Sequence, residues 1–381
     1  MSTSLLSSKA PQYLRLHLAD AIGPVMLGRL IKHFGTVDAI LGASMGALME
    51  VEGIGERRAR SVFEARTDAA VERELAKAAA AGVRIICWED PDYPPQLRHC
   101  SDPPVCLYVR GTLTPEDAVA IAVVGSRKCS RYGYEQAQRF GALLAGAGFT
   151  VVSGLARGVD GYAHEGALSA GGRTVAVLGS GVDVIYPPEH KDLAEKVTAR
   201  GAILSEDPLG SPPSTESFPR RNRIIAGMCL GVLVVEANKR SGALITARLA
   251  SEYNREVFAI PGRVDTATAF GPNDLIRKGA AKLVACLDDI LDELGAVGKT
   301  MGRPAGAPDA PGGLFGGGVA AALSPSERTI LDTLADEEVY VDEIVARCGF
   351  ATAQTISCLT TLQLKGAVVA LPGNRFVRRR E

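Results

Sequence analysis

The sequence lacks the residue patterns that mark several common classes of protein. Its eight cysteines form no CxxC pair and its five histidines form no HxxxH spacing, which argues against a zinc site. Nothing in it marks secretion, which argues against disulfide bonds. No apolar run approaches the roughly 18 residues of a membrane-spanning helix, and the start, MSTSLLSSKA, lacks the basic-then-apolar pattern of a signal peptide. We therefore expect no metal, no membrane contact and a cytoplasmic location.

Two nucleotide-binding signatures are also absent. There is no GxxxxGK[ST] loop, which argues against ATP hydrolysis. A dinucleotide site would place GxGxxG after the first strand and an acidic residue at the end of the second. Here the first turn begins Gly125-Ser126-Arg127 and the second strand ends at Ser153, so both features argue against NAD. No catalytic triad or paired-carboxylate spacing stands out, and His164 fits a packing role better than that of a base. We expect no catalytic residue and no cofactor.

What the sequence does contain is a repeated strand–turn–helix pattern over residues 120–181. Three β-branched runs, Ala120–Val124, Thr150–Val152 and Thr174–Val177, are each followed at once by glycine and serine, and amphipathic stretches separate them. This alternation predicts an α/β fold, a Rossmann-like parallel sheet with helices on both faces. A glycine turn at the carboxyl end of a strand, followed by a helix start with free N–H groups, suits phosphate.

Composition divides the chain into four parts. Residues 1–81 are predicted to be helical, and their GxG turn at 53–55 is typical either of a SAM-like helix-hairpin-helix that binds a DNA phosphate or of a plain turn with a solvated arginine face. Residues 82–293 form the α/β domain. Residues 294–322 are rich in Gly, Pro and Ala and predict a flexible linker. Residues 323–381, with three helices and a β-hairpin, predict a winged-helix domain that contacts either DNA or another protein.

Basic residues follow several strands of the predicted sheet. Arg127 lies in the turn after the first strand, and Arg157 lies in the next turn with Ser153 and Gly154, which add a hydroxyl and a backbone N–H. The carboxyl ends of parallel strands meet at one edge of a sheet, so we expect this edge to gather Arg127, Arg157, Arg220, Arg221, Arg223, Lys239 and Arg240, with Asn222, Ser241 and Gly242 beside them. A row of cations beside N–H groups fits a polyanion better than one nucleotide, although tight strand–helix packing accounts for some of the glycines.

The segment Phe218–Arg223 places four basic or amide side chains directly before an apolar stretch, which is expected to be a helix. Phe218, Tyr132 and Tyr186 are the nearby aromatic candidates for base stacking. Because aromatic residues are only 5% of the chain, phosphate contact is the firmer prediction.

Several long motifs occur in one order across the α/β domain and resemble those of the DNA processing protein A family (DprA, also called Smf). They are GSR at 125–127, SGLARGVD at 153–160, LGSGVDVIYPPEH at 178–190, LSE at 204–206, FPRRNRIIAG at 218–227, EANKRSGALITARLA at 236–250 and VFAIPG at 257–262. The helical front and the winged-helix end also match an architecture that is common in this family.

The resemblance implies a non-enzymatic protein of natural transformation that binds single-stranded DNA. Such a protein would protect incoming strands, load the RecA recombinase on them and form a homodimer through its Rossmann-like domain. The resemblance also implies that the DNA phosphates are held by Gly125, Ser126 and Arg127, and that the basic groove is lined by Arg221, Asn222, Arg223 and Lys239.

Two alternatives stay open. The chain could be a Rossmann-like enzyme that binds or processes a nucleoside monophosphate at the same edge, or a partner-binding scaffold led by the winged helix. In the single-strand-binding interpretation, replacing Arg127 or Arg221 by Ala weakens DNA binding with the fold intact.

Overall fold

The structure is a computed structural model that describes residues 9–19, 22–67, 69–301, 325–334, 339–364, 368–371 and 375–378. Its contacts divide the chain into two compact units, residues 1–303 and 304–381, which are described separately. Most of the predicted linker, residues 302–322, lies outside the described residues. Within the described ranges no helix has the length and apolar character needed to cross a membrane.

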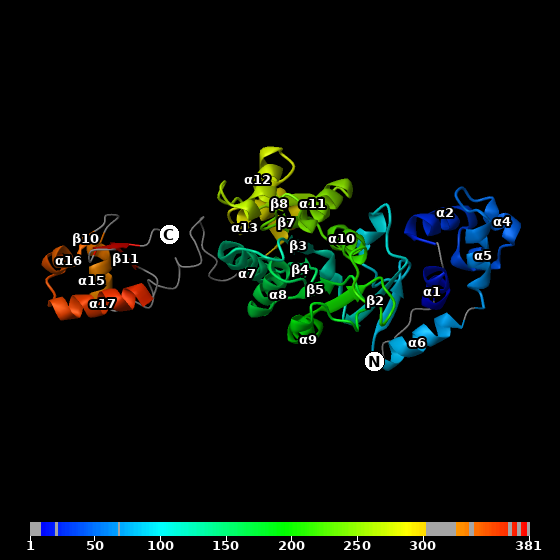
Figure 1. Cartoon of the computed structure of the whole chain (residues 1–381), viewed down its shortest axis with the longest axis horizontal. Coiled ribbons are helices and arrows are strands. Elements are labelled where there is room, and N and C mark those ends of the chain that lie inside the picture. Colours follow the sequence, from blue (N-terminus) through cyan, green and yellow to red (C-terminus); the bar gives the residue numbers. More distant parts are fainter. Residues whose placement is uncertain are drawn as a thin grey trace. The chain divides into compact units, whose positions relative to one another are not determined.

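The first unit begins with six short helices, as the sequence predicts (Figure 1). They are α1 (Ala10–Leu18), α2 (Pro24–Phe34), α3 (Val37–Gly42), α4 (Met45–Met49), α5 (Glu56–Glu64) and α6 (Ala70–Ala80). The turn between α4 and α5 needs Gly53, whose φ of 85° is in the left-handed region. Tyr13 and Leu14 of α1 are fully buried in one apolar core with Ile85 and Tyr108 of the sheet. The helical front therefore packs directly on the sheet.

A nine-stranded sheet forms the centre of this unit, in the order β1-β2-β6-β5-β4-β3-β7-β8-β9. In this order the seven strands from β6 through β3 to β9 pair in parallel, and β1 and β2 add an antiparallel edge. Their bounds are β1 Arg84–Cys87, β2 Cys106–Gly111, β3 Ala120–Val124, β4 Thr150–Ser153, β5 Thr174–Val177, β6 Ala202–Ser205, β7 Gly231–Val234, β8 Glu256–Ala259 and β9 Lys282–Leu283. The strands β3 to β7 are buried throughout and mostly apolar, because helices cover both faces, which confirms the predicted α/β fold.

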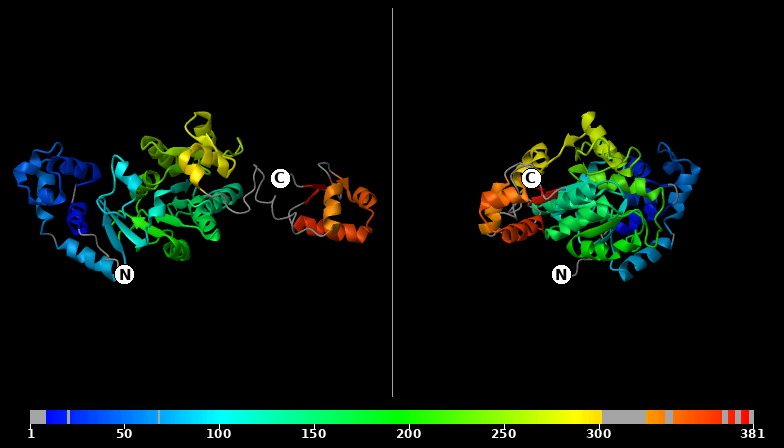
Figure 2. Two further views of the ribbon diagram at one scale, coloured as in Figure 1. Left: turned by 180° about the vertical axis from the view of Figure 1, so that it is seen from behind. Right: turned by 60° about the vertical axis from the view of Figure 1, so that its left-hand side comes forward.

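Alternate residues of β3 point to the two faces of the sheet. Ile121 and Val123 pack with α7 (Arg131–Gly146), α8 (Val159–Ser169) and α13 (Leu287–Glu293). Ala120, Ala122 and Val124 pack with α10 (Ser217–Met228) and α11 (Gly242–Glu252). Figures 1 and 2 show α7 and α8 on one side of the row of strands and α10 and α11 on the other. Two further helices complete the unit's main elements, α9 (Lys191–Arg200) between β5 and β6 and α12 (Phe270–Arg277) after β8.

The strand order reverses between β3 and β7. From β3 the chain crosses to β4 on one side, whereas the later strand β7 pairs with β3 on the other. Loops that leave the carboxyl ends of these two strands therefore diverge and leave a crevice, the usual ligand position in an open α/β sheet.

The described residues of the second unit form three helices and a small sheet. The helices are α15 (Pro325–Thr333), α16 (Val341–Cys348) and α17 (Thr352–Leu364), and the sheet has the order β10-β12-β11, with β10 Val339–Tyr340, β11 Val368–Leu371 and β12 Arg375–Arg378. Ile330, Ile344 and Leu359 are fully buried together and join the three helices. The helices and the hairpin match the predicted winged helix, and β10 is an additional strand that the sequence analysis did not find.

Candidate functional site

A groove lies at the switch point between β3 and β7. It encloses a cavity of about 700 Å³, within the size range of ligand-binding pockets. Its walls come from the loop after β3, from the loop after β7 with the start of α11, and from α10. Eight residues of the set expected at this edge or in the phosphate site line it: Gly125, Ser126, Arg127, Arg221, Asn222, Arg240, Ser241 and Gly242.

The loop after β3 is held closely against the loops after β4 and β7. A Cβ atom at Gly125 would overlap the side chain of Val159 and the carbonyl of Glu236. Val159 N donates to Ser126 O at 3.2 Å, and Ser126 Oγ accepts from Lys128 N at 3.1 Å. Glycine is therefore required at 125 for close approach of backbones, and the first wall of the groove is fixed.

A buried carboxylate, Glu236, ties three loops of the groove together. Ser130 donates to it twice, from its N–H at 2.8 Å and from its Oγ at 2.5 Å, and Thr268 Oγ1 donates at 3.0 Å. Gly133 leaves room for this carboxylate in the first turn of α7. The sequence analysis missed this role, although an acidic residue that ends a buried strand and opens the EANKRSG motif was a visible signal.

Four exposed cations surround the groove without a carboxylate partner among the residues that the structure describes: Arg127, Lys128, Lys239 and Arg240. The Arg127 guanidinium lies 4.6 Å from the ring centroid of Phe218, and Lys239 Nζ lies 5.7 Å from that of Phe270. Phe218 in turn lies 5.9 Å from the ring of Tyr186. Cations and aromatic faces thus occur side by side, and the cations are available to an anionic ligand.

The segment expected to precede a helix is itself helical, because α10 begins at Ser217. Neighbouring side chains on a helix point about 100° apart, so the polar side chains of residues 220–223 cannot share one face. Asn222 lines the groove, and its Nδ2 donates to Gly242 O at 3.3 Å. Arg220 and Arg223, three residues apart, point to a different side of the helix. The expectation that these side chains lie together on one wall is therefore wrong.

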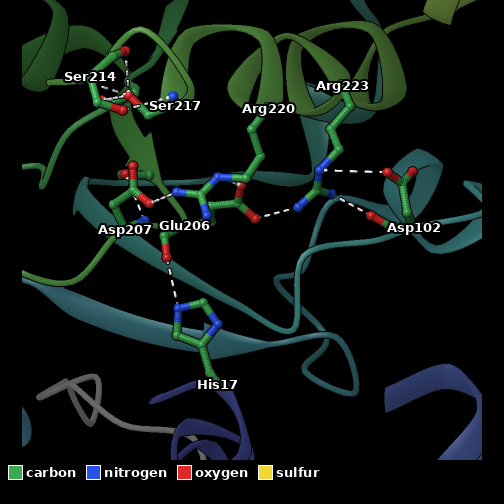
Figure 3. Close-up of polar contacts among 10 residues, drawn as sticks. His17, Asp102, Glu206, Asp207, Ser214, Ser217, Arg220 and Arg223 are labelled. Carbon is green, nitrogen blue, oxygen red and sulfur yellow. Dashed lines mark hydrogen bonds and ion pairs between the residues drawn. The ribbon is translucent and has the colours of Figure 1, made fainter. Parts of the chain in front are cut away.

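Arg220 and Arg223 enter an ion-pair network with the segment after β6 (Figure 3). Arg220 Nε lies 3.1 Å from Glu206 Oε1, and the same guanidinium pairs with Asp207. Arg223 pairs with Glu206 and with Asp102, whose Oδ2 lies 3.7 Å from its Nε. Burial raises the pKa of the Glu206 carboxyl, and Arg223 and Arg220 oppose that shift. In this structure both arginines are occupied by carboxylates and lie outside the groove lining.

The same network reaches the helical front of the chain. His17 of α1 lies with its Nε2 2.7 Å from the carbonyl oxygen of Glu206 (Figure 3). Burial lowers the pKa of this imidazole, against the effect of its hydrogen bond to Glu206. The neutral ring donates to the carbonyl and so links α1 to the segment that holds α10.

Arg221 lies beneath the groove rather than on its surface. Its guanidinium donates to the carbonyl of Val177, and a Cβ atom at Gly154 would overlap it. Burial lowers the pKa of Arg221 to about 10, and the charge of Asp160 opposes this. Burial likewise raises the pKa of the Asp160 carboxyl, against the attraction of Arg221. Arg221 is therefore a buried charge in the groove floor, held by the Val177 carbonyl and attracted by the charge of Asp160.

The remaining predicted residues divide between floor and periphery. Ser153 is fully buried and donates from its Oγ to Val123 O at 2.7 Å. Arg157 pairs with Glu189 and does not line the cavity. Ser241 caps α11, since its Oγ accepts from Ala243 N at 3.3 Å. The groove also contains residues that the sequence analysis passed over, among them Lys128 and Asn238.

His164 has the packing role that the sequence favoured over catalysis. It is fully buried, and its Nδ1 lies 2.7 Å from Thr174 Oγ1. Burial lowers the pKa of His164 to about 3, so the ring is neutral near pH 7. It does not line the groove.

Comparison with known proteins matches three segments of the chain to family models. Residues 84–295 match the family described as DNA recombination-mediator protein A. Residues 19–67 match the SAM-like helix-hairpin-helix tandem, and residues 318–374 match the DprA winged helix domain.

Individual relatives agree with these matches. Protein Smf of Synechocystis is 34% identical over 98% of this chain and 100% of its own length, and protein Smf of Escherichia coli is 41% identical over 77% and 80%. The X-ray structure of DNA processing protein A from Streptococcus pneumoniae superposes with a TM-score of 0.67 at 36% identity, covering 74% of this chain and 97% of that one.

The family match spans more than half of the chain, and the Synechocystis relative is aligned over its full length. The resemblance read from the motifs is thereby confirmed. The chain belongs to the DNA recombination-mediator protein A family, whose members are named DprA or Smf.

Proposed function

We propose that this protein is a single-stranded DNA-binding recombination mediator of natural transformation. It protects incoming strands and loads the RecA recombinase on them. The observation that carries the proposal is the set of four cations around the groove, Arg127, Lys128, Lys239 and Arg240, which have no carboxylate partner in the described part of the chain. Unpaired cations beside backbone N–H groups suit a phosphodiester chain, whose binding they make salt-dependent.

In the proposed complex the phosphates lie along the two loops of the groove. Gly125, Ser126 and Arg127 contact one phosphate, and the start of α11 offers the N–H of Gly242 and its positive dipole end to another, with the Ser241 hydroxyl beside it. Lys239 adds charge at the rim. Bases stack on Phe218 and Tyr186, which stand beside Arg127.

The structure refines which predicted residues we propose as direct contacts. Asn222 joins the residues named above, since it lines the groove from α10. Ser153, Gly154 and Arg221 support these contacts from the groove floor. The arginines that pair with carboxylates hold α10 and the loops at the groove rim in place. The proposed supporting residues are Ser153, Gly154, Arg157, Arg220, Arg221 and Arg223.

The domain division and the assembly are part of the same proposal. The single-strand site belongs to residues 82–293, flanked by the helical domain 1–81, the linker 294–322 and the winged helix 323–381. The protein acts in the cytoplasm as a homodimer, without enzymatic activity. Size-exclusion chromatography with light scattering tests the dimer, and RecA filament assembly on protein-coated single strands tests the loading. A monomer, or no stimulation of assembly, would remove the corresponding part of the proposal.

The experiment that tests DNA binding measures fluorescence anisotropy of labelled oligothymidylate and of a matched duplex with the full chain. We expect tighter binding of the single strand, with an affinity that falls steeply with salt. Equal affinity for both, or binding that salt leaves unchanged, would contradict the proposal.

A second candidate is an enzyme that binds or processes a nucleoside monophosphate in the same groove. It rests on the glycine turn at Gly125 and the unpaired Arg127, which together could hold one phosphate. Thermal unfolding separates the two, because stabilisation by thymidine monophosphate but not by oligothymidylate would favour the enzyme.

A further inference from the structure

Cations and exposed aromatic rings also meet at a second place along this edge of the sheet. The loop after β8, residues 260–269, lies next to the loop after β7, because Ala237 N donates to Thr268 O at 2.7 Å and Gly271 N donates to Ala237 O at 2.8 Å. Its other side contacts α7, where Tyr132 Oη donates to Pro261 O at 3.0 Å. The β8 loop thus continues the row of loops that forms the groove.

Three large apolar side chains are exposed around this loop. Phe270 is 45% exposed, Tyr132 is 42% exposed and Val264 is 97% exposed. Lys239, at the rim of the groove, has its Nζ 5.7 Å from the Phe270 ring, whereas Arg263 of the same loop pairs with Asp265. An aromatic ring with an unpaired cation beside it repeats, one strand along, the arrangement of the half-buried Phe218 and Arg127 in the groove.

In the opposite direction the charges are arranged differently. Toward β5 and β6 the basic side chains at the edge are occupied by carboxylates, Arg157 by Glu189 and Arg220 by Glu206 and Asp207. A strand that left the groove on that side would have to displace ion pairs. A strand that left toward β8 would meet the unpaired Lys239 and an exposed ring.

We propose that the single-strand path continues from the groove over the β8 loop, where Lys239 holds a phosphate and Phe270 stacks a base of the next nucleotides. This subsite rests on the proposed function and gives the bound strand one direction of exit. Tyr132 forms its far side, where its phenol is fixed by Pro261.

The test compares two lengths of oligothymidylate on the full chain by fluorescence anisotropy. An oligomer of about six nucleotides occupies the groove alone, and one of about eighteen exceeds the roughly 4–16-nucleotide sites of single-strand-binding folds. We expect Phe270→Ala to lower the affinity for the long oligomer by about fivefold or more, which corresponds to the lower range of base–aromatic stacking energies. The affinity for the short oligomer should be unchanged. Lys239→Ala should lower the log–log salt slope for the long oligomer by about 0.7.

Matched controls locate the effect. Phe63 of α5 is 46% exposed and has the Arg66 guanidinium 4.3 Å from its ring, and Lys196 of α9 is exposed, so Phe63→Ala and Lys196→Ala repeat the same chemistry elsewhere. Both should bind both oligomers like the wild type. An equal loss in Phe63→Ala and Phe270→Ala would overturn the assignment, because the effect would not belong to the β8 loop.

The remaining outcomes separate this subsite from the groove itself. If the wild type binds neither oligomer, the proposed function fails. If Arg127→Ala lowers the affinity for the short oligomer while Phe270→Ala leaves the affinity for the long oligomer unchanged, only the proposed subsite is wrong. If Phe270→Ala changes the oligomeric state on sizing and not the DNA affinity, the exposed rings form a protein contact and the proposal is overturned. Thermal unfolding of each variant checks that the fold is retained.

Discussion

Arg127 and Arg221 differ in what their loss should do, although the sequence suggested the same role for both. Arg127 is exposed at the groove and has no carboxylate partner in the described ranges. Arg221 is 5% exposed, donates to the carbonyl of Val177 and is attracted by the charge of Asp160, which is 7% exposed. We expect Arg127→Ala to reduce single-strand affinity with little change in stability, and Arg221→Ala to destabilise the fold.

The magnitudes follow from these positions. Arg221→Ala removes the donor to the Val177 carbonyl and the positive charge near the buried Asp160 carboxylate, and leaving a buried polar group without its partner costs about 1–3 kcal/mol. Arg127→Ala removes a cation–π interaction that contributes about 0.5–1 kcal/mol at an exposed site. Removing one cation from a phosphate of a single strand lowers the log–log salt slope by about 0.7, so the affinity defect of Arg127→Ala should shrink by about threefold between about 50 and 200 mM salt.

Two assays separate the variants. Urea unfolding gives the free energy of unfolding, and anisotropy of labelled oligothymidylate at several salt concentrations gives the affinity and the slope. Arg248→Ala is the matched control, since Arg248 is an exposed arginine of α11 paired with Glu252. Equal unfolding free energies for Arg127→Ala and Arg221→Ala would refute the claim that the buried Arg221 stabilises the fold. An unchanged slope in Arg127→Ala would refute the phosphate contact.

Four further predictions follow from the same contacts. Glu206→Gln removes the shared partner of Arg220 and Arg223, so it should lower stability and DNA affinity but leave the salt slope unchanged; a lower slope would instead mean that one of these arginines binds a phosphate directly. His164 has its pKa lowered by burial to about 3, so the unfolded state binds the extra proton and stability falls as pH drops below about 6.5. Urea unfolding at about pH 7 and pH 5 should therefore show a fall in the free energy of unfolding that is about 2 kcal/mol smaller in His164→Gln than in the wild type. An equal fall in both proteins would contradict a buried neutral His164. Deleting residues 304–381 should leave oligothymidylate affinity within about twofold, because the proposed contacts lie in the other unit, and abolished binding would favour the winged helix as the DNA site. Oligothymidylate should raise the unfolding temperature and thymidine monophosphate should not, and the reverse would favour the enzyme.

The sequence predicted the sheet and its turns because their signals are local. β-branched runs followed by glycine mark the strand ends directly, and the observed β3, β4 and β5 begin and end within one residue of the predicted runs. The glycine at 125 could be assigned to a close backbone approach for the same reason. Arg127, two residues on in the same loop, lines the groove.

The partners of the remaining cations could not be read from the sequence. Glu206 follows β6 and is separated from α10 by a loop, and only the fold of that loop brings it to Arg220 and Arg223. The start of α10 was also misplaced, because Pro219 and a run of basic residues resemble a loop, whereas Pro fits the first turn of a helix. Because these residues lie in a helix, the consecutive arginines point in different directions and have different surroundings. Charge counted along the chain therefore overstated the basic character of the groove.

The central claim is that single-stranded DNA lies in the groove between the loops after β3 and β7. A crystal structure of the full chain with oligothymidylate tests this most directly. We predict phosphates within hydrogen-bonding distance of Arg127 and of the backbone N–H groups of residues 125–127 and Gly242, with Arg220 and Arg223 still paired to Glu206. An oligomer bound only to the helical front or to the winged helix, with the groove empty, would contradict the account.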